Sequence, residues 1–175
     1  MITRIPRLID MGPEAVHITA QIMILLLAAN GTPVLLERIS GDRFQHPLDG
    51  GCRFRDGRPW FGPSKTWRGF VGGVLAATAV APWVGLPWSV GLSIGTVSLL
   101  GDLASSFLKR RLGIPPSGMA LGLDQIPEVL FPLLWIRESF HLTWSYIAWA
   151  TLLFLVAELG LSAVLYRLHI RKRPY

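Results

Sequence analysis

Long apolar runs separated by short polar stretches dominate this chain. A helix that spans about 30 Å of hydrocarbon needs about 20 apolar residues. Five stretches approach that length, although the fourth is short: residues 15–36, 69–86, 88–108, 122–136 and 144–165. The pattern predicts an all-α integral membrane protein, a bundle of about five transmembrane helices forming a single domain over residues 1–175.

Basic residues gather on one side of these segments. If the N-terminus is outside, fourteen of the 17 Lys and Arg residues fall inside, and only Arg4, Arg7 and Arg137 fall outside. The positive-inside rule therefore predicts a cytoplasmic first loop, third loop and C-terminus, with the protein integral to the cytoplasmic membrane. The first fifteen residues are charged and lack a small-residue cleavage site, so we expect the first segment to be retained.

Composition narrows the functional classes. Hydrophobic residues make up 51% of the chain, charged residues 16%, and the mean hydropathy is +0.44. The net charge of +6 would suggest nucleic-acid binding in a soluble domain, but membrane topology accounts for it here, and we expect no nucleic-acid partner. A single cysteine, Cys52, excludes an internal disulfide framework.

Pairs of glycines with small-xxx-small spacing occur in the second and third segments. They are Gly69 with Gly73 and Gly91 with Gly95. Such pairs let helix backbones approach closely. Packing within the bundle is the favoured interpretation, and a contact between two copies in a homodimer is the alternative.

The third segment acquires an acid and then bases as it reaches its end. Asp102, Ser105 or Ser106, and Lys109 share one helix face. A carboxylate within a membrane span is rarely kept without a partner. Asp102 therefore indicates either a functional acid, with a metal ion as its partner, or a structural ion pair with Lys109.

A second acid, Asp124, lies where the chain re-enters the membrane at the same side. Two carboxylates at one depth could hold a divalent cation, and hard oxygen ligands suit Mg²⁺ together with substrate phosphates. We therefore expect Asp102 and Asp124 as metal ligands in phosphate chemistry. The alternative is that Asp124 only caps the helix that it begins.

The first loop ends in a cluster of donors before the second helix, whose N-terminus attracts anions. The donors are Ser64, Lys65, Thr66 and Arg68. They indicate a phosphate cradle or, alternatively, a basic loop that touches anionic lipid headgroups. Asn30 interrupts the first apolar segment beside Pro33, where capping of exposed backbone is favoured over recognition of a nucleobase.

Taken together and in order, these motifs resemble the CDP-archaeol synthase family, membrane cytidylyltransferases related to CDP-diacylglycerol synthases. The matching residues are Ala29-Asn30-x-x-Pro33-Val34, Pro47-Leu48-Asp49-Gly50-Gly51, Asp56-Gly57-Arg58, residues 61–69, Gly101-Asp102-Leu103, residues 106–111 and Leu123-Asp124-Gln125. The resemblance implies a five-helix bundle with a polar cytoplasmic pocket, in which CTP and an unsaturated archaeal ether-lipid phosphate react with Mg²⁺ and release pyrophosphate.

The resemblance also implies residue roles. Asp102 and Asp124 would position metal and triphosphate and, with Lys109, make up the catalytic set. The implied substrate-binding residues are Asn30 near the cytidine, then Asp56, Ser64, Lys65, Thr66, Arg68, Ser106, Arg110 and Gln125. Two positions depart from the family: Pro127 replaces a usual aspartate, with Glu128 one step later, and Pro115 replaces a frequent lysine.

Two other functions remain open from sequence. The same reaction on phosphatidic acid would make the protein a CDP-diacylglycerol synthase. Alternatively, the two departures would suit an inactive membrane protein that binds CTP and lipid.

Overall fold

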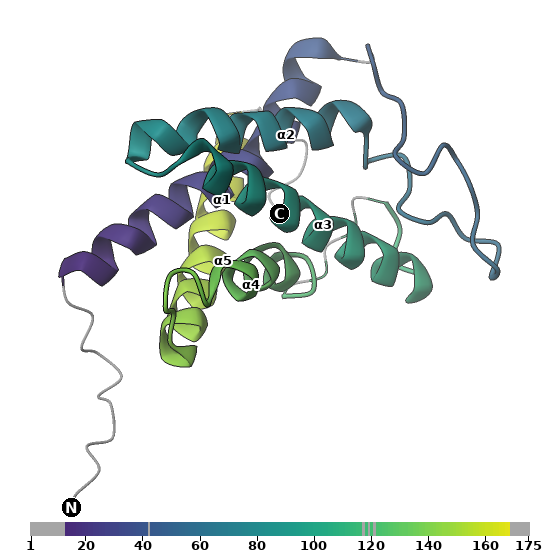
Figure 1. Cartoon of the computed structure of the whole chain (residues 1–175). Coiled ribbons are helices and arrows are strands. Elements are labelled where there is room, and N and C mark those ends of the chain that lie inside the picture. The colour runs from purple at the N-terminus through teal and green to yellow at the C-terminus, as the bar shows by residue number, and fades with distance from the viewer. Residues whose placement is uncertain (1–12, 42, 117, 119, 121, 169–175) are drawn as a thin grey trace, which may run out of the picture.

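The computed structural model describes residues 13–41, 43–116, 118, 120 and 122–168. Within them the chain forms five α-helices and a short 3₁₀ helix (Figure 1): α1 Pro13–Ser40, α2 Trp67–Val80, η1 Ala81–Val84, α3 Trp88–Arg111, α4 Gln125–Ile136 and α5 Trp144–Arg167. The prediction of an all-helical bundle is confirmed. Two predictions concern positions outside the described residues: retention of the first segment, as far as it rests on residues 1–12, and the cytoplasmic basic tail at residues 171–173.

The five helices differ in their ability to cross a membrane. By length and composition, three of the described helices are sufficient: Val16–Ser40, Trp88–Arg111 and Trp144–Val164. With 14 and 12 residues, α2 and α4 rise only about 21 and 18 Å. Five helices are thus confirmed, but only three have full spanning length, and α2 continues through η1.

The loops at one end of the bundle carry the polar side chains. Loop 41–66 and loop 112–124 lie beside the C-terminal end of α3, and we call this the polar end (Figure 1). The apolar core fills the other half of the molecule, where fully buried side chains from four helices meet: Ile22, Leu25, Leu26, Ile94, Val129, Leu133 and Phe154. Apolar packing therefore stabilises one end of the bundle, whereas the polar end depends on ion pairs and hydrogen bonds.

Glycines on α2, which have no side chain, let α1 and α2 approach closely. A Cβ on Gly73 would lie 2.4 Å from the carbonyl oxygen of Ala29, and one on Gly69 would lie 3.2 Å from Cβ of Pro33. Pro33 has no N–H to donate to the Ala29 carbonyl one turn earlier. Gly73 therefore allows α2 to cover a carbonyl that the helix itself leaves unpaired.

Glycines of α3 allow the same close approach to α2 and to α4. A Cβ on Gly91 would lie 2.4 Å from the Ala77 carbonyl oxygen, and one on Gly95 would lie 2.9 Å from Cβ of Ala77. On α3, a Cβ on Gly101 would lie 2.2 Å from the carbonyl oxygen of Pro127 on α4. The interpretation that these glycines pack the bundle internally is confirmed.

We predict that Gly101→Ala destabilises the protein, because the added methyl group would meet α4 backbone that cannot rotate away. The expected loss is about 1–3 kcal/mol. Thermal unfolding in detergent would measure it. Gly160→Ala on α5, where nothing lies within 4 Å of the new Cβ, is the matched control and should leave the unfolding temperature nearly unchanged. Equal stability of the two variants would contradict the close contact of α3 with α4.

Candidate active site

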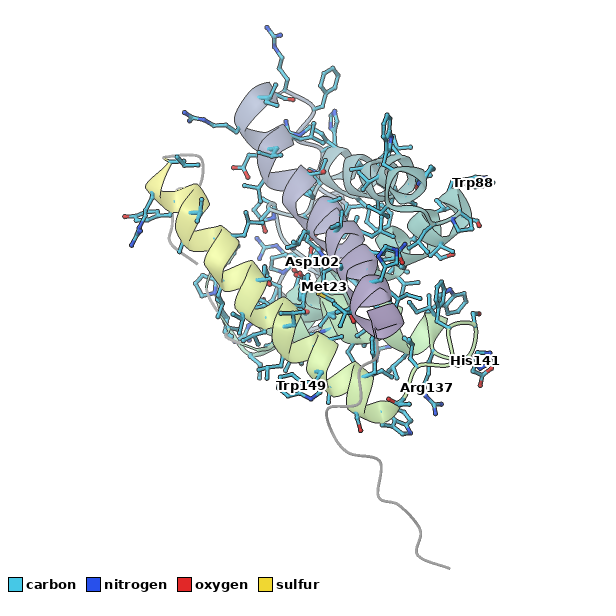
Figure 2. The ribbon with its side chains drawn as sticks, turned by 90° about the vertical axis from the view of Figure 1, so that its left-hand side faces the viewer. Met23, Trp88, Asp102, Arg137, His141 and Trp149 are labelled. Carbon is cyan, nitrogen blue, oxygen red and sulfur yellow. The ribbon has the colours of Figure 1, made fainter. Side chains whose placement is uncertain are left out.

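The first ion pair of the polar end joins the loop before α2 to the interior of α3. Lys65 Nζ donates to both carboxylate oxygens of Asp102, at 2.6 and 2.5 Å. Asp102 lies nine residues before the end of α3, which is about 13 Å along the helix axis. Figure 2 accordingly shows Asp102 near the middle of the molecule, between α1 and α5. The site therefore reaches well into the bundle.

This pairing corrects one of the two sequence interpretations, the structural ion pair of Asp102 with Lys109. The reason is the shortness of α2. Because α2 begins only at Trp67, the loop residue Lys65 lies deep enough to reach Asp102.

Lys109 instead pairs with the second predicted acid. Its Nζ lies 2.7 Å from Asp124 Oδ1, and the other oxygen of Asp124 accepts a hydrogen bond from the Ala120 amide at 3.2 Å. The capping interpretation of Asp124 is wrong, since the residue has helical dihedral angles and its side chain makes no cap hydrogen bond. Gln125, the next residue, accepts from the Gly122 amide through Oε1 at 2.9 Å and holds the turn before α4.

Arg110 is a buried cation with unused donors. The residue is 4% exposed, and Nη2 donates to the Pro115 carbonyl at 3.1 Å. Its Nε and Nη1 are buried without an acceptor among the described residues. Buried donors of a charged group that lack acceptors are costly. An anion with several oxygens would satisfy them.

Glu128 on α4 is an acid that the sequence reasoning left out of the site. It is 6% exposed, and its carboxyl group lies against that of Asp102. The signal was present in the sequence, because an acid in an apolar helix is a candidate functional residue in a membrane protein. The periodicity of α4 alone did not show which way the side chain points.

Asp49 organises the loop that carries Lys65. Its Oδ2 accepts hydrogen bonds from the amides of Phe61 and Gly62, at 3.0 and 2.9 Å, and its Oδ1 accepts from the Gly51 amide at 3.0 Å. The Leu48 amide also donates to the Lys65 carbonyl at 2.8 Å. Asp49 was part of the sequence resemblance but was not among the predicted site residues.

The two loop charges titrate in opposite directions. Burial alone would raise the pKa of Asp49, but the backbone amides of Gly62, Phe61 and Gly51 outweigh it and lower that pKa below its ordinary 3.8. Burial alone would lower the pKa of Lys65, but neighbouring carboxylates, Asp102 foremost, raise it above its ordinary 10.5. Both groups are therefore charged at neutral pH, which keeps the loop and the ion pair intact.

Three predicted substrate-binding residues hold the loop rather than face Asp102. Asp56 Oδ1 lies 2.6 Å from Arg111 Nη1 at the end of α3. Arg68 donates to the carbonyls of Gly41 and Arg43, while Thr66 accepts from the Gly69 amide at 3.2 Å and caps α2.

Asn30 ties α1 to α3 at a deeper level. Its Nδ2 donates to the Leu26 carbonyl at 3.0 Å and to Ser98 Oγ at 2.9 Å. The Leu26 carbonyl is not the Ala29 carbonyl that Pro33 leaves unpaired, so the capping interpretation stays a prediction, and the bond to the fully buried Ser98 is what joins the two helices. Of the remaining predicted residues, Ser106 is buried on α3 near Lys109, whereas Ser64 is exposed on the loop.

Comparisons with known proteins find relatives of this chain. A family model described as CDP-archaeol synthase matches residues 16–87 and 85–175. A CDP-archaeol synthase of Pyrococcus furiosus is 42% identical over 107 residues, covering 55% of this chain and 60% of that protein. One of Pyrobaculum arsenaticum is 34% identical over 155 residues, covering 84% and 91% respectively.

The chain spans about three fifths of the length of several of these relatives, which come from Pyrococcus, Hyperthermus and Thermococcus. A solved structure, described as an intramembrane enzyme for archaeal membrane lipid biosynthesis, is also similar. It has a TM-score of 0.69 and 28% identity, covering 80% of this chain and 89% of that one.

We predict that Asp49→Asn loosens the loop before α2, because the amide keeps the shape of the carboxylate but loses its charge. Amide hydrogen exchange at Phe61 and Gly62 should accelerate about tenfold. The wild type should show the same loosening as pH falls below 3.8 through the lowered pKa of Asp49, since the stabilising form is the charged one. Glu37→Gln, at an exposed position on α1, is the control. Unchanged exchange in Asp49→Asn would show that Asp49 does not hold the loop.

Proposed function

The chain belongs to the CDP-archaeol synthase family, and on that premise we propose that it is a CTP-dependent cytidylyltransferase. It would join CTP to a membrane lipid phosphate, forming a CDP-lipid and releasing pyrophosphate. The lipid that we propose is an ether lipid phosphate resembling archaetidic acid. Phosphatidic acid, the substrate of a CDP-diacylglycerol synthase, is the alternative.

The observation that carries this proposal is the group of cations at the polar end of α3. Lys65, Lys109 and Arg110 lie beside the paired acids, and Arg110 keeps two buried donors without acceptors among the described residues. A triphosphate offers many oxygen acceptors and a high negative charge. It would supply acceptors for the two unpaired donors of Arg110, and it could replace the acids as the partner of Lys65 and Lys109.

The reaction needs no covalent enzyme intermediate. A lipid phosphate oxygen would attack the α-phosphorus of CTP in line, and the bond to the β-phosphate oxygen would break, with its electron pair leaving on pyrophosphate. The chain's contribution is to orient the two substrates and to neutralise charge on the triphosphate. Lys65 and Lys109, now paired with acids, would transfer their hydrogen bonds to phosphate oxygens.

The acids suit Mg²⁺, which takes one or two carboxylates and completes its coordination with water and substrate phosphates. Asp102 and Asp124 are the ligands proposed from sequence. Bound there, the ion would withdraw charge from the phosphate oxygens and favour departure of pyrophosphate. Ser106 and Gln125 would border the same space, whereas Asp56, Ser64, Thr66 and Arg68 would act through the loop that presents Lys65. Asn30 would border the cytidine.

We propose that the polar end faces the cytoplasm, where CTP is found. The support is the charge asymmetry of the loops, which the positive-inside rule relates to orientation. A single domain over residues 1–175, in the cytoplasmic membrane with the N-terminus outside, is part of this proposal.

Orientation can be tested with the cysteine already present. Cys52 is exposed in loop 41–66. A membrane-impermeant maleimide should label it only after cells are permeabilised. In a Cys52→Ala background, Ser145→Cys at the start of α5 should be labelled in intact cells. The reverse pattern would overturn the proposed orientation.

Activity can be tested on the purified chain in lipid nanodiscs, with CTP, Mg²⁺ and defined glycerol-1-phosphate and glycerol-3-phosphate lipids. Asp102→Asn should abolish pyrophosphate release, and Arg110→Gln should lower it about 10²–10³-fold, since a donor to the reacting phosphates is lost. Arg38→Gln, an exposed position in the last turn of α1, is the control.

Mass spectrometry of the lipid product would identify the preferred substrate. No product with any lipid phosphate would refute the enzymatic proposal. Saturable CTP binding without turnover would instead favour the inactive binding protein.

A further inference from the structure

Glu128 is a buried acid that lies beside a second acid, Asp102. It lies in the first turn of α4 and is 6% exposed. Its Oε2 is fully buried and has no hydrogen-bond partner among the described residues. A carboxyl oxygen in this position loses its hydration without replacement, which is costly unless another group completes it.

The side chains around Glu128 include more carboxyl groups than cations. Its carboxyl group lies against that of Asp102 on α3 and close to Glu158 on α5. The nearest cation is Lys65, which donates to both oxygens of Asp102. The carboxyl groups of Asp102 and Glu128 therefore share one ammonium group, and a further positive charge would be stabilised there.

The backbone fixes this juxtaposition. Gly101 lets the carbonyl of Pro127 approach α3 so closely that a Cβ on Gly101 would lie 2.2 Å from it. Asp102 and Glu128 are the next residues on the two helices. The contact between the helix backbones thus places the two carboxyl groups together.

Asp124 differs from Glu128 in this respect. One of its oxygens pairs with Lys109 and the other accepts from the Ala120 amide. To bind a cation through Oδ1, Asp124 would have to release Lys109. Oε2 of Glu128 has no such partner to release among the described residues.

We propose that Glu128, together with Asp102, binds the divalent cation that the cytidylyl transfer uses, while Lys65 is released from Asp102 toward the nucleotide phosphates. This inference rests on the proposed function. Within the part of the chain that the structure describes, no group of three or more Asp, Glu, His or Cys side chains could hold a metal ion. Two carboxylates completed by water and phosphate oxygens are the arrangement that Mg²⁺ commonly adopts.

The test is binding of Mn²⁺, a paramagnetic substitute for Mg²⁺, by electron paramagnetic resonance. The full chain in nanodiscs is titrated with and without CTP, in the absence of lipid phosphate, so that no turnover is needed. Glu128→Gln should weaken Mn²⁺ binding at least about tenfold, and Glu128→Asp, which keeps a carboxylate, should weaken it less. Glu138→Gln, exposed beyond the end of α4, is the matched control and should bind as the wild type does.

Thermal unfolding of each variant separates loss of the ligand from loss of the fold. If Glu128→Gln does not fold, the comparison of Glu128→Asp with wild type decides, and equal affinity would overturn the proposal. Wild-type affinity in folded Glu128→Gln would do the same. So would loss of binding in Asp124→Asn alone, or a wild type that binds no Mn²⁺. Mn²⁺ binding through Glu128 without pyrophosphate release would refute the proposed function and leave only the cation site standing.

Discussion

Neutralisation of Asp102 is the constraint on which the polar end depends. The carboxylate of Asp102 lies about 13 Å along α3 from its end and is only 17% exposed, and its bidentate partner comes from a loop. For Lys65 to arrive there, α2 has to begin late, and Asp49 has to fold the preceding residues onto its carboxylate. Pro33 and the glycines of α2 then fix α2 against α1. The ion pair, the loop and the helix contact form one unit.

The sequence alone was sufficient to predict the helices and to recognise most of the charged residues near the candidate site. Five apolar segments and the acids Asp102 and Asp124 could be recognised because hydrophobic length and isolated charges are local properties. The pairing of lysines with acids could not be recognised, because it depends on where loop 41–66 folds. That fold rests on hydrogen bonds from Asp49 to amides twelve and thirteen residues away. Glu128 was missed because only the contact of Gly101 with Pro127 shows which carboxyl it meets.

Two of the site's cations are paired with acids of the chain itself. Lys65 and Lys109 each neutralise an acid within the chain, so neither is an unpaired buried charge while the nucleotide is absent. Arg110 is different, because two of its donors stay unsatisfied. Arg58 and Arg111 complete the polar end by bonding to backbone carbonyls of α3 and of the loop. The cations that we propose to bind substrate and the cations that hold the fold are therefore adjacent in sequence but separate in their contacts.

The short lengths of α2 and α4 have a consequence for the bilayer itself. Helices of about 21 and 18 Å match a thinner hydrocarbon layer than α1, α3 and α5 do. A bilayer that matched them would be thinner there, and this would bring a lipid headgroup toward the level of Asp102 while its chains stayed among other chains. Lifting a lipid into water costs about 0.8 kcal/mol for every methylene group exposed. Local thinning of the bilayer would avoid this cost, because the headgroup would reach the polar end without its chains leaving the hydrocarbon layer.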